Sequence, residues 1–121
     1  MLKEKFAISI PNEWLDGKKD DYFLLTVEGD SYTPYYAEDD LLIICKDLSK
    51  LDINDVRVYE INGAFELRKY GLSTNGTELL LGLTGYIPKL ENVGFKLCGF
   101  VYMRITNYRK GAADNGKNEA D

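Results

Sequence analysis

The chain has 121 residues, with 15 basic and 20 acidic side chains and a formal net charge of −5, which suits one domain with its own core. It contains no histidine, and this excludes Ser-His-Asp and Cys-His catalysis as well as histidine-ligated metal sites. An acidic chain is also a poor general binder of nucleic acid, because phosphate contacts need clustered lysine and arginine.

Seven segments have the composition of β-strands, because large apolar and aromatic residues dominate them and turn residues separate them. In chain order they are residues 5–10, 22–28, 41–45, 56–61, 64–70, 78–83 and 95–105. The one helix candidate is short, residues 11–15, with Pro11 near its first turn. Asn62-Gly63 predicts a type I′ hairpin turn, and Asn75-Gly76 marks a second turn. The pattern predicts a mainly β fold, a small and mostly antiparallel barrel or sandwich.

The composition changes near the C-terminus. From Asn107 onward the chain is rich in Gly, Asn, Asp and Ala, which predicts one domain over residues 1–106 and a disordered tail over 107–121. Cys45 and Cys98 lie in apolar runs and are expected to be buried, reduced thiols. Neither a secretory signal nor a membrane-spanning run is present, so we expect a cytoplasmic protein without membrane contact.

Residues 29–42 carry a chemical signature. Gly29, Asp30 and Ser31 follow the second predicted strand at the point where it breaks. A serine there can project its hydroxyl from the sheet beside backbone N–H groups that form an oxyanion hole. Most such serines only cap turns, so this triplet alone is a weak signal.

The wider context resembles the LexA-like family of self-cleaving serine peptidases. That family includes the LexA repressor, the C-terminal domains of lambda-type phage repressors and the UmuD polymerase accessory proteins. Its nucleophile segment reads G-[DN]-S-M-x-P, followed after a few residues by G-D-x-[VL]. The matching positions are Gly29, Asp30, Ser31, Pro34, Asp40 and Leu42. Residues 54–58 resemble a second acidic turn and CGFVYMRI resembles the last strand, so the resemblance covers about residues 8–105 and implies that Ser31 holds the nucleophile position.

The sequence departs from the family pattern at three positions. Tyr32 stands where methionine is usual, and Asp39 where glycine is usual. The family's general base is a lysine in a context like V-K-R-L, and the equivalent run LRKY places Arg68 there. A guanidinium is permanently charged and cannot accept a proton.

Lys69 is the alternative base. Neighbours in a strand point to opposite faces, so Lys69 replaces Arg68 only through a bulge or a one-residue slip. The resemblance therefore implies an inactive pair of Ser31 and Arg68. There are two other interpretations. One is an active dyad of Ser31 and Lys69, and the other is a serine of no catalytic importance.

The last predicted strand is long and apolar, and such a strand pairs with another chain if it forms an exposed edge. In the resembling repressors the C-terminal domain dimerises, in LexA through its last strand. The resemblance thus implies a homodimer in which the two segments 95–105 run antiparallel across a two-fold axis. The interface would include Phe95, Leu97, Phe100 and Tyr102.

No cofactor and no metal site are expected, since Asp30, Asp39 and Asp40 match no metal-binding loop. The residues before Ser31 contain neither a helix-turn-helix pattern nor the Ala-Gly or Cys-Gly dipeptide at which family members cleave themselves. Direct DNA binding would therefore need a separate N-terminal domain.

Together these features predict a C-terminal regulatory and dimerisation domain of a phage- or mobile-element-type transcriptional repressor. It has lost self-cleavage and meets a protein partner or inducer. Two alternatives stay open: an active self-cleaving peptidase that uses Ser31 with Lys69, and a UmuD-like accessory protein of a repair polymerase.

Overall fold

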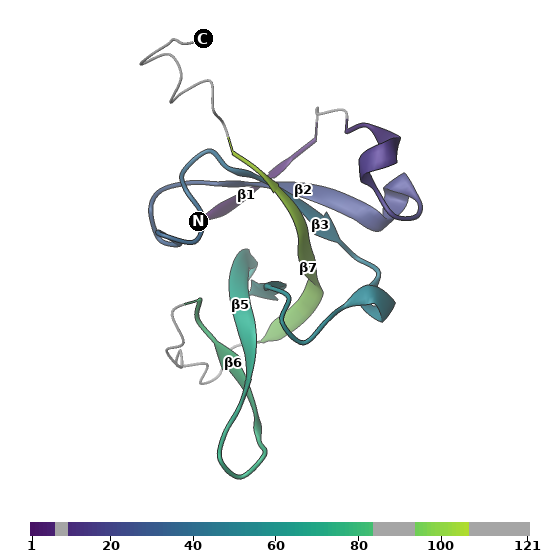
Figure 1. Ribbon diagram of the computed structural model, residues 1–121. Helices are drawn as coiled ribbons and strands as arrows, with labels where there is room; N and C mark the ends of the chain where they lie inside the picture. The colour runs from purple at the N-terminus through teal and green to yellow at the C-terminus, as the bar shows by residue number, and fades with distance from the viewer. Residues whose placement is uncertain (7–9, 84–93, 107–121) are drawn as a thin grey trace.

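The computed structural model describes residues 1–6, 10–83 and 94–106. Its strands form one antiparallel sheet in the order β1-β2-β3-β7-β4-β5-β6 (Figure 1). They are β1 (Leu2–Lys5), β2 (Tyr22–Val27), β3 (Leu41–Cys45), β4 (Arg57–Ile61), β5 (Ala64–Leu72), β6 (Glu78–Leu81) and β7 (Phe95–Ile105). The helical elements of the described residues are three single 3-10 turns, η1 (Asn12–Trp14), η2 (Lys19–Asp21) and η3 (Leu48–Lys50). The predicted mainly β, antiparallel fold is confirmed.

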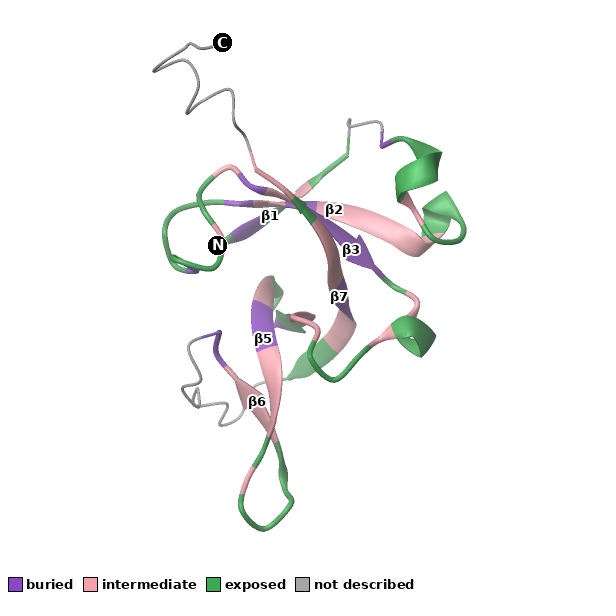
Figure 2. Ribbon diagram, in the orientation of Figure 1, coloured by how far each residue is buried: buried purple, intermediate pink, exposed green. Residues whose placement is uncertain are grey.

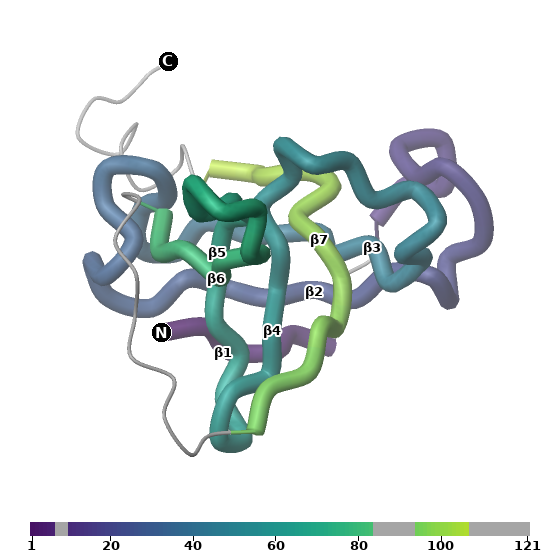
Figure 3. Tube along the Cα trace, turned by 90° about the horizontal axis from the view of Figure 1, so that it is seen from below, coloured from purple at the N-terminus to yellow at the C-terminus, as the bar shows by residue number. Residues whose placement is uncertain are grey.

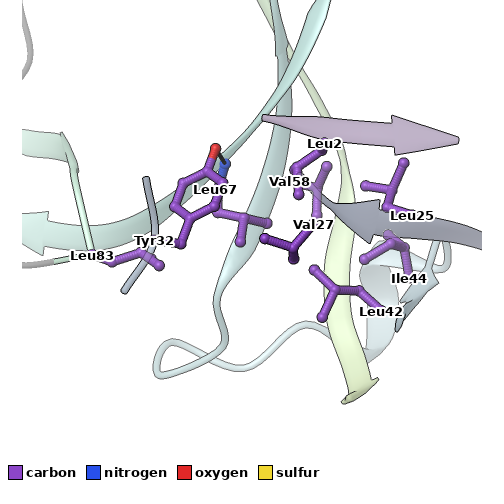
Figure 4. Packing of buried hydrophobic residues seen from close by; sticks show 9 residues of the cluster. All are labelled: Leu2, Leu25, Val27, Tyr32, Leu42, Ile44, Val58, Leu67 and Leu83. Atoms are coloured by element: carbon purple, nitrogen blue, oxygen red, sulfur yellow. Dashed lines mark hydrogen bonds between the residues drawn. The ribbon is translucent and has the colours of Figure 1, made fainter. Parts of the chain in front are cut away.

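The sheet curls on itself, because β1 at one edge contacts β5 near the other edge. In the view from below, β1 and β2 run across β4 and β5 rather than beside them (Figure 3). Apolar side chains on the inner face of this curl form one buried cluster (Figure 4). Its members are Leu2, Leu25, Val27, Tyr32, Leu42, Ile44, Val58, Leu67 and Leu83. Buried residues gather on β3 and the middle of β5 (Figure 2), and each fully buried leucine contributes about 1.5–3 kcal/mol.

The hairpin of β4 and β5 has the predicted turn. Asn62 and Gly63 both have positive φ, 52° and 81°, as a type I′ turn requires. The ladder then runs without a register shift from the Ile61–Ala64 pair to the pair of Arg57 with Arg68. This register therefore places the side chains of Arg68 and Arg57 on the same face of the sheet.

The position of β7 differs from the expectation of a free edge strand. Its first half pairs with β4, from Phe95 to Phe100, and its second half pairs with β3, from Phe100 to Ile105. The strand thus lies inside the sheet, and full-length pairing with a second copy is not available to it. Phe100 is only 5% exposed in the single chain, and its place in a dimer interface stays a prediction. Phe95 is exposed, and Leu97 and Tyr102 are half-buried.

Two further expectations are corrected at the N-terminal end. The first strand covers Leu2–Lys5 instead of residues 5–10, and residues 7–9 lie outside the described part of the chain. The helix candidate is only the 3-10 turn η1.

The remaining expectations concern the cysteines and the tail. Both cysteines are free thiols, with Cys45 buried and Cys98 half-buried. The predicted tail, residues 107–121, falls outside the described residues. In the part of the chain that the structure describes, no helix has the length and hydropathy to cross a membrane.

Candidate functional site

The loop between β2 and β3 carries the serine and is closed at both ends by backbone bonds. Gly29 has φ +79°, a conformation that suits glycine, where the chain leaves β2. Asp39 has φ 72°, and its N–H donates to the carbonyl of Val27 at 2.8 Å. A glycine is usual at this position, and aspartate is one of the few residues that tolerates the left-handed region. Asp40 is buried, and its Oδ2 accepts from the N–H of Ala37 at 2.9 Å, which fixes the end of the loop.

Ser31 is exposed on this loop. Its neighbours close a tight turn, in which the N–H of Thr33 donates to the carbonyl of Asp30 at 3.1 Å. Within the described residues, neither the hydroxyl nor the backbone N–H of Ser31 takes part in a hydrogen bond. Both groups are thus free to meet a ligand.

A cavity of about 230 Å³ lies between this loop and β5. Its lining consists of Met1, Ser31, Tyr32, Thr33, Tyr35, Ala64, Glu66, Leu67, Arg68 and Leu83. Ser31 and Arg68, which are far apart in the sequence, thus line one cavity. Lys69 does not line it. We call it the serine cavity.

Arg68 is almost fully buried, with 8% of its surface exposed. Its Nη1 donates to the carbonyl of Leu67 at 2.9 Å and to Glu66 Oε1 at 3.2 Å. Arg57 stands opposite on β4, which places two like charges across the ladder, and its guanidinium stacks on the Tyr70 ring at 4.8 Å. Glu66 therefore compensates part of the positive charge that two adjacent arginines bring to this face.

Tyr32 connects the serine loop to β5, although the sequence pattern indicates only that it replaces the usual methionine. Its hydroxyl accepts from the N–H of Leu67 and donates to Glu66 Oε1, both at 3.2 Å (Figure 4 shows Tyr32 beside Leu67). Burial raises the pKa of Tyr32 to about 12. A tyrosine in a core needs a partner for its hydroxyl, which is the sequence signal that could have pointed to a polar neighbour.

Lys69 takes no part in this network. It pairs with Leu81 of β6, and its Nζ sits 5.5 Å from the centroid of the Tyr35 ring. The unbroken ladder of β4 and β5 contains no bulge that would move Lys69 into the place of Arg68. Lys69 lines a second cavity, described below.

The described residues contain no group of three or more Cys, Asp or Glu side chains arranged to hold a metal ion. The chemistry that the serine cavity offers is that of an exposed hydroxyl, a buried guanidinium and the Glu66 carboxylate. The described residues that line it include no lysine.

Comparison with known proteins agrees with the motif. A family model described as Peptidase S24-like matches residues 2–81, which include the serine loop and the hairpin that carries Arg68. A search of curated proteins finds no match. The chain therefore belongs to the Peptidase S24-like family, that of LexA, UmuD and the C-terminal domains of phage repressors.

Proposed function

We propose that this chain is the regulatory and dimerisation domain of a phage- or mobile-element-type transcriptional repressor, and that it does not cleave itself. One observation carries the second half of the proposal. The side chain that shares the cavity with Ser31 is Arg68, while Lys69 contacts Tyr35 in a different cavity.

The energies of proton transfer support an inactive site. A lysine base needs its pKa lowered from about 10.4 to about 7–8, which costs about 4 kcal/mol. An arginine needs a drop of about five or six units, or about 7–8 kcal/mol. Glu66 forms an ion pair with the Arg68 guanidinium at 3.2 Å. Arg68 therefore does not act as the proton acceptor for Ser31.

Dimerisation is supported by the second half of β7. On the side facing β4, the last backbone bond to this strand runs from the N–H of Val101 to the carbonyl of Val56. Beyond it, residues 102–105 pair only with β3 among the described strands. This half-edge has the length of a short strand, and because no described strand pairs with its side away from β3, a second copy can pair there.

The catalytic half of the proposal is tested by the reactivity of Ser31. The 121-residue chain, Ser31→Ala, Arg68→Lys and Lys69→Met are incubated with a fluorophosphonate probe between pH 7 and pH 10, and intact mass reports labelling. We expect no labelling of the unaltered chain above Ser31→Ala. Arg68→Lys should gain labelling that increases with pH, because a lysine there can lose its proton to water and then accept one from Ser31.

Two results would contradict this proposal. Labelling of the unaltered chain that disappears in both Ser31→Ala and Lys69→Met would establish an active dyad of Ser31 and Lys69. Absence of labelling in Arg68→Lys, with circular dichroism unchanged, would show that position 68 is not the base position. Either result is read without knowing which peptide the site cleaves or binds.

A further inference from the structure

A second cavity, of about 340 Å³, lies beside the serine cavity and carries two cations. Its lining is Tyr35, Tyr36, Val56, Lys69, Leu83 and Arg104. The Nζ of Lys69 lies 5.5 Å from the centroid of the Tyr35 ring, and the Arg104 guanidinium lies 5.7 Å from that of Tyr36. We call it the cationic cavity.

Neither cation of this cavity forms an ion pair with a described residue. Arg104 Nη1 donates to the carbonyl of Tyr35 at 2.7 Å, which holds the guanidinium in place without cancelling its charge. The two ion pairs formed among the described residues, Lys50 with Asp16 and Arg68 with Glu66, involve neither cation. The buried Asp40 influences the pKa of Tyr36, but its Oδ2 is bonded to a backbone N–H. Two cations thus line one cavity in a chain of net charge −5, which gives the cavity a positive local potential.

The two cavities are neighbours. Tyr35 and Leu83 line both the serine cavity and the cationic cavity. The serine loop borders both cavities on one side, and β5 borders both on the other through Arg68 and Lys69. An extended chain that passes Ser31 therefore reaches the cationic cavity with a neighbouring side chain.

We propose that the cationic cavity binds an acidic side chain of an extended peptide from a partner protein, whose adjoining residues lie in the serine cavity. A carboxylate matches Lys69 and Arg104 through charge-assisted hydrogen bonds. The methylene stem of the same side chain fits the apolar surfaces of Val56 and Leu83 and the tyrosine rings. A small inorganic anion has no such stem, which favours a peptide ligand. The inference rests on the proposed function in one respect, that the serine cavity holds a peptide without cleaving it.

The test is an NMR titration of the ¹⁵N-labelled 121-residue chain. The two probes are end-blocked peptides, Gly-Ala-Gly-Glu-Ala-Gly and the same peptide with Gln in place of Glu. We expect the Glu peptide to bind about tenfold more tightly and to shift the amide signals of Tyr35, Lys69 and Arg104. Added salt should weaken the binding of the Glu peptide, because the site is partly exposed and its charges are screened.

Three variants locate the effect. Lys69→Gln and Arg104→Gln should each lower the affinity for the Glu peptide by about fivefold. Lys96→Gln removes the same charge from an exposed position at the other end of β7 and should leave the affinity unchanged. The salt dependence of Glu-peptide binding to the unaltered chain tests the same charges without any variant.

Several outcomes would overturn the inference. Equal affinity for the Glu and Gln peptides would show that the cationic cavity does not recognise the carboxylate. Displacement of the Glu peptide by an equal concentration of inorganic phosphate would show a site for free anions. A change in sedimentation without a change in peptide affinity, for Lys69→Gln and Arg104→Gln, would assign both cations to self-association. The labelling of Ser31 in Arg68→Lys does not depend on the cationic cavity, so a failure here is distinct from a failure of the proposed function.

Discussion

At the scale of single residues, the hydroxyl of Tyr32 joins the two parts of the chain that line the serine cavity. This hydroxyl accepts a hydrogen bond from the N–H of Leu67 and donates one to Glu66, and it thereby links the serine loop to β5. The methionine that is usual at this position would fill a similar volume but could not bond the buried N–H of Leu67. The site has therefore exchanged a purely apolar contact for a polar one.

Tyr32→Phe should lower the free energy of unfolding by about 1–3 kcal/mol at pH 7, because the buried N–H of Leu67 loses its partner. Urea-induced unfolding measures this change. Tyr59→Phe is the matched control, since Tyr59 is also buried but its hydroxyl makes no hydrogen bond with a described residue. Its effect should stay within about 0.5 kcal/mol. Equal losses in the two variants would show that the Tyr32 hydroxyl carries no special weight.

The same pair of variants gives a pH dependence. The pKa of Tyr32 is about 12 in the folded chain against 10.0 for an ordinary tyrosine. The unfolded chain therefore loses this proton first, and the contribution of Tyr32 is complete below pH 10 and is lost as the pH rises toward 12. The stability advantage of the unaltered chain over Tyr32→Phe should shrink in that window. An advantage that stays constant through it would contradict the raised pKa.

At the scale of elements, β7 fits between β3 and β4 because Gly99 has no side chain. A Cβ at that position would lie 2.4 Å from the carbonyl oxygen of Cys45 and 2.9 Å from Cγ2 of Ile44. The register of the β3 and β7 pair shifts just beside this contact, between Ile43 and Ile44. The Cys98-Gly99 dipeptide thus serves the packing of the sheet.

Gly99→Ala should destabilise the fold by about 1–3 kcal/mol, because the contact with the Cys45 carbonyl forces the backbone of β7 or β3 to move. Gly94→Ala is the control, since a Cβ there meets no atom of the described residues within 4 Å. Its change should be below about 0.5 kcal/mol. Chemical denaturation of both variants decides the matter, and equal midpoints would refute the close-packing argument.

The elements also show how far the sequence predicts this molecule. Residue composition and turn signals gave both ends of β3 and β7 and the turn at Asn62, because those signals are local. The same signals do not predict β1, because its one apolar residue is Leu2 and its position depends on the pairing of Leu2 with Val27 on β2. The motif placed Ser31 and Arg68 in a common site. Neither the link from Tyr32 to Glu66, 34 residues apart, nor the interior place of β7 has a local signal.

At the scale of the whole molecule, the curled sheet limits how two copies can meet. Because β4 covers one side of the first half of β7, and β3 covers the opposite side of the second half, each half lacks a described strand on one side. For residues 102–105 this side faces away from β3, beyond the bond from Val101 to Val56. An antiparallel pairing of two such half-edges obeys a two-fold axis and needs no rearrangement of the sheet.

This arrangement predicts opposite behaviour for the two ends of β7. Sedimentation at high micromolar concentration should show a dimer for the unaltered chain and a monomer for Ile105→Glu. The carboxylate would lose water at the seam and face its copy across the axis, where like charges repel. Phe95→Glu makes the same chemical change at the exposed first half of the strand and should remain a dimer. Circular dichroism checks that both variants keep the fold. A monomeric unaltered chain would refute dimerisation, and dissociation by Phe95→Glu alone would place the contact on the first half of β7.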